Sequence, residues 1–173
     1  MSTDPTAPPR DLAGYVAALV ETLARAEPAA LTRMRDVVGA RRARIGLDRE
    51  AVDVAFAPSG ALVVGAPGAL GPIDGEGRTD RDTVLDLLDG YLEVVEAILA
   101  GRLDAVGDVE AVARIFAAVE IMLDASSRAP GLQDLAREYR TSGPGPREPA
   151  GRRRRHGDDA EPERRLLQRL DLL

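Results

Sequence analysis

The stretch RTDRDTVLDLLDGYLEVVEAILAGRLDAVGD, residues 78–108, holds two short apolar segments that each end at a glycine. It predicts one helix over residues 80–90 and a second over residues 91–101. Gly90 and Gly101 are placed to end these helices in left-handed geometry. Both segments are apolar around more than half of the helix circumference, which is typical of helices that are buried on several sides or line an apolar cavity.

The sequence before this stretch starts with two amphipathic helices. Asp11 is placed to cap the first one, whose apolar residues recur at helical spacing over residues 12–23. Pro28 suits the first turn of the second helix, and Gly39 suits its end.

The first two strands are predicted where the apolar pattern changes to a period of two, and the third is a short apolar run. The first three are expected to be antiparallel and joined by short turns, and a loop rich in glycine and proline follows them. The last one follows the second short helix, at residues 103–106, and Asp108 then caps a further helix. The strands are expected at residues 43–47, 52–56, 61–65, 74–78 and 103–106.

The sequence after the strands predicts a long amphipathic helix with an apolar stripe over residues 112–123, and a short helix over residues 132–139. Composition divides the chain into a disordered leader (1–10), a folded domain (11–140), a disordered linker (141–160) and a short amphipathic segment (161–173).

The order of these elements, together with residues 78–108, resembles the sterol carrier protein 2-like family. The resemblance is carried by Arg78-Thr79-Asp80, by the run from Val84 to Gly90, by the run from Ala97 to Leu103, and by Gly107-Asp108. It implies an α+β fold in which a mainly antiparallel, five-stranded curved sheet is covered by helices and encloses an apolar tunnel. In the family this tunnel takes sterols, acyl chains or other lipids, and some members are accessory domains.

Composition excludes several kinds of chemistry. The 173 residues contain no cysteine, and all 23 basic residues are arginine, which rules out disulfides, cysteine nucleophiles and lysine Schiff bases. A net charge of −6 argues against nucleic-acid binding. No apolar run is long enough to span a membrane, so we expect a cytoplasmic protein. The many Ala, Gly, Arg and Pro residues favour a GC-rich, bacterial genome.

The candidate ligand-binding residues are the large apolar side chains of the expected tunnel, and ordinary core packing is the alternative for each of them. Aromatic residues make up only 3% of the chain, so few large side chains are available to fill the core, which favours a cavity. The candidates are Phe56, Leu88, Tyr91, Leu92, Val95, Ile98, Ile115, Phe116, Val119 and Met122.

No catalytic residue, metal ligand or cofactor is predicted. His156 is the only histidine and lies in the charged linker. The acid pairs Asp86/Asp89 and Glu93/Glu96 are more typical of solvated helix faces than of a general acid and base.

The C-terminal segment has four leucines on one helical face, Leu166, Leu167, Leu170 and Leu173. A helix this short is marginal alone and must pack on something. It can dock on another protein, fold back on its own domain or lie on a membrane surface.

Two functions follow from the sequence. The first is non-enzymatic binding of a lipid, sterol or acyl chain in an internal cavity. The second is a protein-interaction or accessory module that is held on a larger assembly through its leucine-rich segment.

Overall fold

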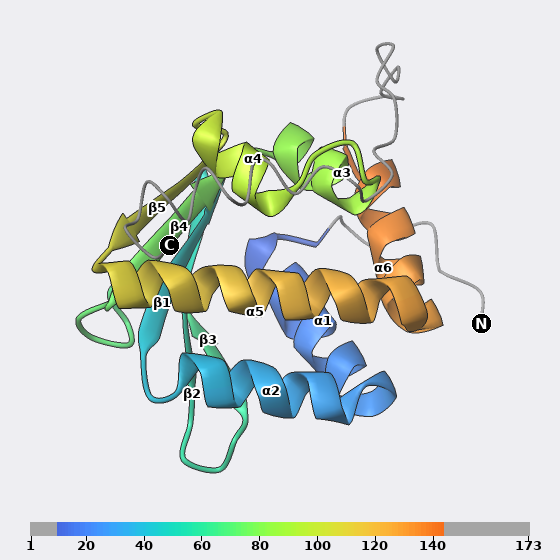
Figure 1. Ribbon diagram of the computed structural model, residues 1–173. Coiled ribbons are helices and arrows are strands. Elements are labelled where there is room, and N and C mark those ends of the chain that lie inside the picture. Colours follow the sequence, from blue (N-terminus) through green and yellow to red (C-terminus); the bar gives the residue numbers. More distant parts are fainter. Residues whose placement is uncertain (1–9, 144–173) are drawn as a thin grey trace, which may run out of the picture.

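The chain is described here by a computed structural model over residues 10–143. Within this range it forms six helices and five strands, and all five strands belong to one sheet (Figure 1). The α+β fold predicted from the sequence is therefore confirmed. The predicted leader, linker and C-terminal segment lie outside the described residues, apart from Arg10 and residues 141–143.

The helices are α1 (Leu12–Ala26), α2 (Pro28–Val38), α3 (Arg81–Leu88), α4 (Val94–Leu99), α5 (Val109–Arg128) and α6 (Pro130–Thr141). The strands are β1 (Arg42–Leu47), β2 (Glu50–Phe56), β3 (Leu62–Gly65), β4 (Gly75–Thr79) and β5 (Leu103–Gly107).

The sheet has the strand order β3-β2-β1-β4-β5. Three neighbouring pairs are antiparallel, and β1 and β4 run parallel, with Ala43 opposite Gly75. The first residues of β1 and β4 therefore lie at the same end of the sheet. Helix α1 packs on β2 and β3, α5 packs on β4 and β5, and α2 packs on α5 (Figure 1).

Three helix starts and two terminating glycines lie where the sequence predicts them. Helices α1, α3 and α5 each follow an aspartate whose side chain accepts an N–H from the residue three positions later. Such a bond satisfies one of the unpaired donors of the first turn. Gly90 and Gly101 have φ angles of 70° and 66°, the left-handed geometry expected at these positions. The capping pairs are Asp11 with Gly14, Asp80 with Thr83, and Asp108 with Ala111.

The second short helix is shorter than predicted. It was expected over residues 91–101, but α4 begins only at Val94, and Tyr91 and Leu92 precede it. The reason is the way α3 ends: the Tyr91 N–H donates to the Asp86 carbonyl at 2.8 Å, which closes the turn around Gly90. Glu93, in an extended conformation, then precedes the first turn of α4.

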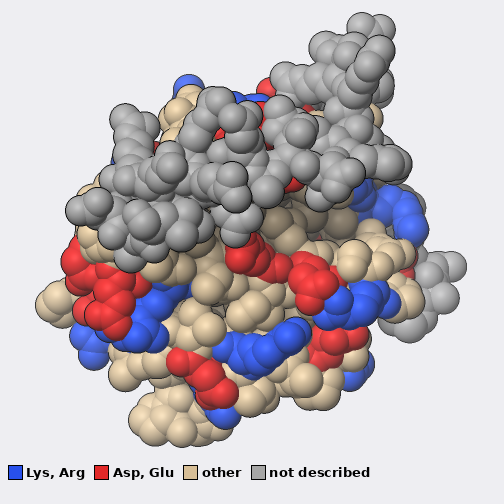
Figure 2. Space-filling view, in the orientation of Figure 1, with Lys and Arg blue, Asp and Glu red and all other residues tan. Residues whose placement is uncertain are grey.

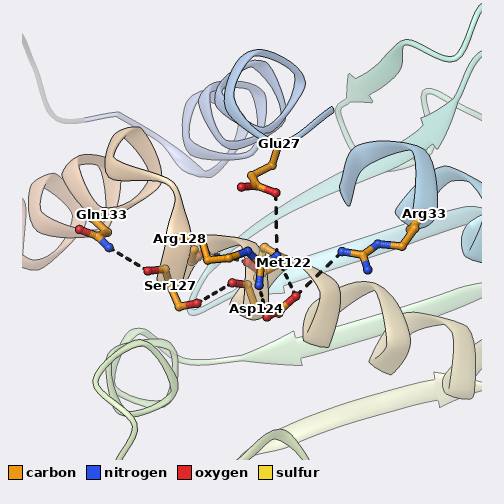
Figure 3. Close-up of polar contacts among 8 residues, drawn as sticks. Glu27, Arg33, Met122, Asp124, Ser127, Arg128 and Gln133 are labelled. Atoms are coloured by element: carbon orange, nitrogen blue, oxygen red, sulfur yellow. Dashed lines mark hydrogen bonds and ion pairs between the residues drawn. The ribbon is translucent and has the colours of Figure 1, made fainter. Parts of the chain in front are cut away.

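The most deeply buried cluster lies where α1, α2, α5 and α6 meet, and three of its five residues are alanines. Such small side chains let helices approach one another closely. Polar contacts surround this junction (Figure 3): Arg128 binds Asp124 within α5 and lies 3.9 Å from Glu27, and Arg33 lies 3.9 Å from Asp124. The cluster consists of Leu23, Ala30, Ala125, Ala129 and Leu132. This cluster therefore lies between helices, away from the sheet.

Candidate ligand-binding cavity

A cavity of about 370 Å³ lies between the sheet and the helices. Its walls come from the sheet and from helices α1, α2, α3, α5 and α6. Its apolar side chains include Val16, Leu19 and Val20 of α1, Ala43, Ile45 and Leu47 of β1, Leu87 and Leu88 of α3, Ile115, Phe116, Val119 and Met122 of α5, and Leu135 of α6.

The burial pattern of β1 reflects this cavity. β1 is the central strand of the sheet, where inward side chains are normally closed off by close packing. Yet Ala43, Ile45 and Leu47 are only partly buried, and all three line the cavity. Helices cover the sheet without filling the space against it.

Part of this space comes from β4. Gly75 and Gly77 line the cavity where other strands present side chains. A Cβ atom placed on Gly75 would lie 3.0 Å from Cδ1 of Ile115, whereas one placed on Gly77 would lie 3.9 Å from Cγ2 of Ile115. Helix α5 thus closes tightly on the start of β4 and leaves room further along it.

Six of the ten predicted ligand-binding residues line the cavity, and four do not. The six are Phe56, Leu88, Ile115, Phe116, Val119 and Met122. The four are Tyr91, Leu92, Val95 and Ile98, which belong to α4 or the turn before it. Helix α4 packs on β5 and α5 and buries Val94 and Ala97. The apolar character of α4 is therefore explained by its contacts with these elements, and not by a place in the cavity wall.

The cavity also involves residues that the sequence did not single out. Val16 and Leu19 of α1, Leu135 of α6 and the inward side chains of β1 belong to apolar faces of the predicted elements, and the sequence gives them no ligand role. Their periodicity identifies a buried face but does not show whether another side chain or empty space lies opposite.

Most hydroxyl groups around the cavity are engaged with the protein. Tyr15 Oη donates to Ser142 Oγ at 2.9 Å, Thr79 Oγ1 to the Arg102 carbonyl at 3.0 Å, and Ser126 Oγ to the Met122 carbonyl at 2.8 Å. These bonds hold the walls together and orient the hydroxyl hydrogens away from a ligand.

Tyr139 is the exception among these hydroxyls. Its oxygen is buried and has no hydrogen-bond partner within the described residues. Its ring meets the ring of Tyr15 edge-on at 5.1 Å and lies 4.2 Å below the guanidinium of Arg81. Burial raises the pKa of Tyr139 to about 12, so the phenol stays neutral.

Charged residues line the cavity mainly at one end. Arg41 Nη2 lies 3.0 Å from Glu110 Oε1, and Arg114 Nη2 lies 2.6 Å from the same oxygen. The hydrogen bond from Arg114 and the nearby charge of Arg41 lower the pKa of Glu110. Arg114 Nη1 also donates to the Val37 carbonyl, at the end of α2, at 2.5 Å.

The visible face over α5 carries acidic and basic side chains together, with no large patch of one sign (Figure 2). Within residues 10–143 no three His, Asp or Glu residues are grouped so that they can hold a metal ion. No helix in this range has the length and apolar character needed to cross a membrane.

No family model matches the sequence, and no curated protein matches it. Solved structures do match. A sterol carrier protein domain 2 from Helicoverpa armigera is 15% identical, with 74% of this chain and 96% of that chain covered and a TM-score of 0.49. A conserved hypothetical protein, possibly a sterol carrier protein, from Thermus thermophilus is 20% identical, with 80% and 96% covered and a TM-score of 0.46.

A third match is a UbiJ-SCP2 ubiquinone synthesis protein, which is 19% identical, with 62% of this chain and 95% of that chain covered and a TM-score of 0.46. The first and third of these are sterol carrier protein 2 structures, the family that the sequence resembles, and the second is possibly a sterol carrier protein. At identities below 25% the likeness concerns the fold alone.

Proposed function

We propose that this chain binds a lipid, sterol or acyl chain in the cavity between its sheet and its helices, without carrying out a reaction. The observation that carries the proposal is the cavity itself, which is lined mostly by apolar side chains from the sheet and from the helices. Each methylene that leaves water for such a site contributes about 0.8 kcal/mol.

The size of the cavity favours a slender ligand. Its volume of about 370 Å³ is near the lower end of the range of roughly 300–1,000 Å³ in which ligand pockets fall. A single chain or a compact ring system suits this space better than a lipid with two acyl chains.

The polar groups at the cavity support binding without chemistry. Three of its hydroxyls, on Tyr15, Thr79 and Ser126, already donate to protein oxygens. The chain has no cysteine or lysine, and its one histidine lies outside the described residues. The walls thus offer a ligand apolar surface in place of an activated nucleophile.

The direct test is to titrate the delipidated protein with a fluorescent acyl-chain probe and to compete the probe with unlabelled chains and sterols. We expect one saturable site and an affinity that rises with chain length until the cavity is full. A signal that never saturates would overturn the proposal.

Two matched substitutions locate the site. Val119→Phe adds bulk inside the cavity, whereas Val95→Phe adds the same bulk on α4, which does not line it. Because lost room for two methylenes costs about 1.6 kcal/mol, Val119→Phe should weaken binding by tenfold or more. Val95→Phe should leave the affinity unchanged, and equal effects of the two would place the ligand elsewhere. Circular dichroism checks that both variants keep their helices.

A further inference from the structure

A groove of about 890 Å³ lies beside the cavity, at the end of β2 where the hairpin to β3 begins (Figure 1). Its lining comes from the last turn of α2, from the connection between α2 and β1, from the hairpin and from the loop after β3. Among the described residues, only Ala55 and Phe56 line both the groove and the cavity. The wall between the two spaces is therefore one residue thick at this point.

The register of the sheet explains why Phe56 lies in this wall. The last residue of β2 that pairs with β1 is Ala55, so Phe56 extends past β1 and pairs only with Leu62 of β3. The residues that lead into β1 include Gly39 and Ala40, which line the groove and have little or no side chain to close it. The partly buried ring of Phe56 is thus the largest side chain between the cavity and the groove.

The part of the cavity wall formed by α3 and α6 is held by polar contacts. These helices lie on the side of the molecule away from the hairpin (Figure 1). Arg140 on α6 lies 2.6 Å from Asp89 at the end of α3, and Tyr15 on α1 donates to Ser142 at the end of α6 at 2.9 Å. Opening the cavity there would break a charge-assisted hydrogen bond, which is stronger than a neutral one, whereas turning the ring of Phe56 breaks no hydrogen bond.

We infer that the ligand enters and leaves the cavity through this groove, and that the side chain of Phe56 is the gate. The inference rests on the proposed function and adds the route by which the ligand reaches its site. A rotamer change of one side chain is fast in comparison with the movement of a helix. With the ring displaced, the cavity and the groove become one continuous space.

Two phenylalanine variants test the gate. Stopped-flow fluorescence of an acyl-chain probe gives the association and dissociation rate constants. Phe56→Leu should raise both several-fold, because a lower barrier speeds passage in both directions. Phe116→Leu makes the same change at a residue that lines the cavity but not the groove. It removes a contact with the bound ligand, so it should change the dissociation rate constant and leave the association rate constant at the wild-type value.

A second pair of variants blocks the route from outside. Ala40 is exposed and lines the groove but not the cavity, so Ala40→Trp adds bulk to the route without altering the ligand's contacts. Both rate constants should fall several-fold while the affinity stays unchanged. Ala100→Trp places the same side chain at an exposed position at the end of α4, outside both linings, and should change neither constant. This pair keeps the test decisive if Phe56→Leu does not fold.

The outcomes separate the two proposals. Failure of the wild-type protein to bind the probe overturns the proposed function. Saturable binding with an association rate constant that neither Phe56→Leu nor Ala40→Trp alters overturns the gate alone, because the ligand then passes elsewhere. An equal slowing by Ala40→Trp and Ala100→Trp would assign the effect to added bulk at the surface and would also overturn the gate.

Discussion

At the scale of single residues, Asp53 shows how the sheet keeps a charge inside. Its side chain has no exposed surface. Its neighbour Val54 lines the cavity, and because side chains alternate along a strand, Asp53 faces the other side of the sheet. Arg44 binds it through Nε at 2.7 Å and Nη2 at 3.2 Å, and the Gly68 N–H donates to it at 2.5 Å. These bonds offset the cost of removing the carboxylate from water.

This arrangement predicts an acid-sensitive stability. The hydrogen bond from Arg44, aided by the one from Gly68, lowers the pKa of Asp53 in the folded state. Since the folded pKa lies below the unfolded value of about 3.9, the stabilisation is complete above that value and is lost as the pH falls through it towards the folded pKa. Asp53→Asn should lower the free energy of unfolding at neutral pH and flatten its decline below about pH 4.

Urea denaturation over a pH series measures both effects. Asp134→Asn, at an exposed position on α6, is the matched control and should keep the wild-type pH dependence. An Asp53→Asn protein whose stability declines with acid as steeply as that of the wild type would contradict the prediction.

At the scale of elements, the two glycines of β4 set the distance between the sheet and α5. A methyl group at Gly77 would meet Ile115 Cγ2 at 3.9 Å, an ordinary contact, whereas one at Gly75 would approach Ile115 Cδ1 to 3.0 Å. The space beside β4 therefore admits a methyl group at Gly77 but not at Gly75, two residues earlier.

Alanine substitutions at Gly77 and Gly75 should change the free energy of unfolding in opposite directions. Gly77→Ala should raise the free energy of unfolding by about 0.5–1 kcal/mol, because glycine is a poor strand residue and the new methyl group fills empty space. The same methyl group should weaken acyl-chain binding. Gly75→Ala should destabilise the protein, because Ile115 or α5 must shift to admit it. Denaturant titration of both variants measures the difference, and a stability change of equal sign and size in the two would contradict this account of the space.

At the scale of the whole molecule, the role of the leucine-faced segment, residues 161–173, is a proposal, because this segment lies outside the described residues. Its leucines, Leu166, Leu167, Leu170 and Leu173, share one predicted helical face after a linker of polar composition. A cluster of exposed apolar side chains favours association, and a flexible connection raises the effective concentration of a weak contact. We propose that this segment docks on a protein partner.

Deletion of residues 160–173 tests whether the segment belongs to the folded domain. We expect the melting temperature and the affinity for the acyl probe to stay unchanged, because the described lining of the cavity and the buried cluster come from residues 12–139. A fall of several degrees together with loss of ligand binding would show that the segment covers its own domain, and the docking proposal would then fail.

Much of this fold follows from local signals. Asp11, Asp80 and Asp108 cap helices where the sequence places them, because a cap depends only on neighbouring residues. The period-two pattern marks β1 and β2 for a similar reason. The predicted start of α4 was wrong because Tyr91 and Leu92 are as apolar as the helix that follows, and only the closing turn of α3 excludes them.

The sequence by itself determined the order of helices and strands, the capped helix starts and which faces are buried, because these depend on spacing along the chain. Only the tertiary structure decided which buried faces meet a cavity. Val95 and Val119 are both valines on apolar helices, yet α4 packs on β5 and α5, whereas α5 crosses the glycines of β4. The pairing of Arg41 and Arg114 on Glu110 depends likewise on how α2, β1 and α5 come together, because burial and contact are properties of elements brought together from distant parts of the chain.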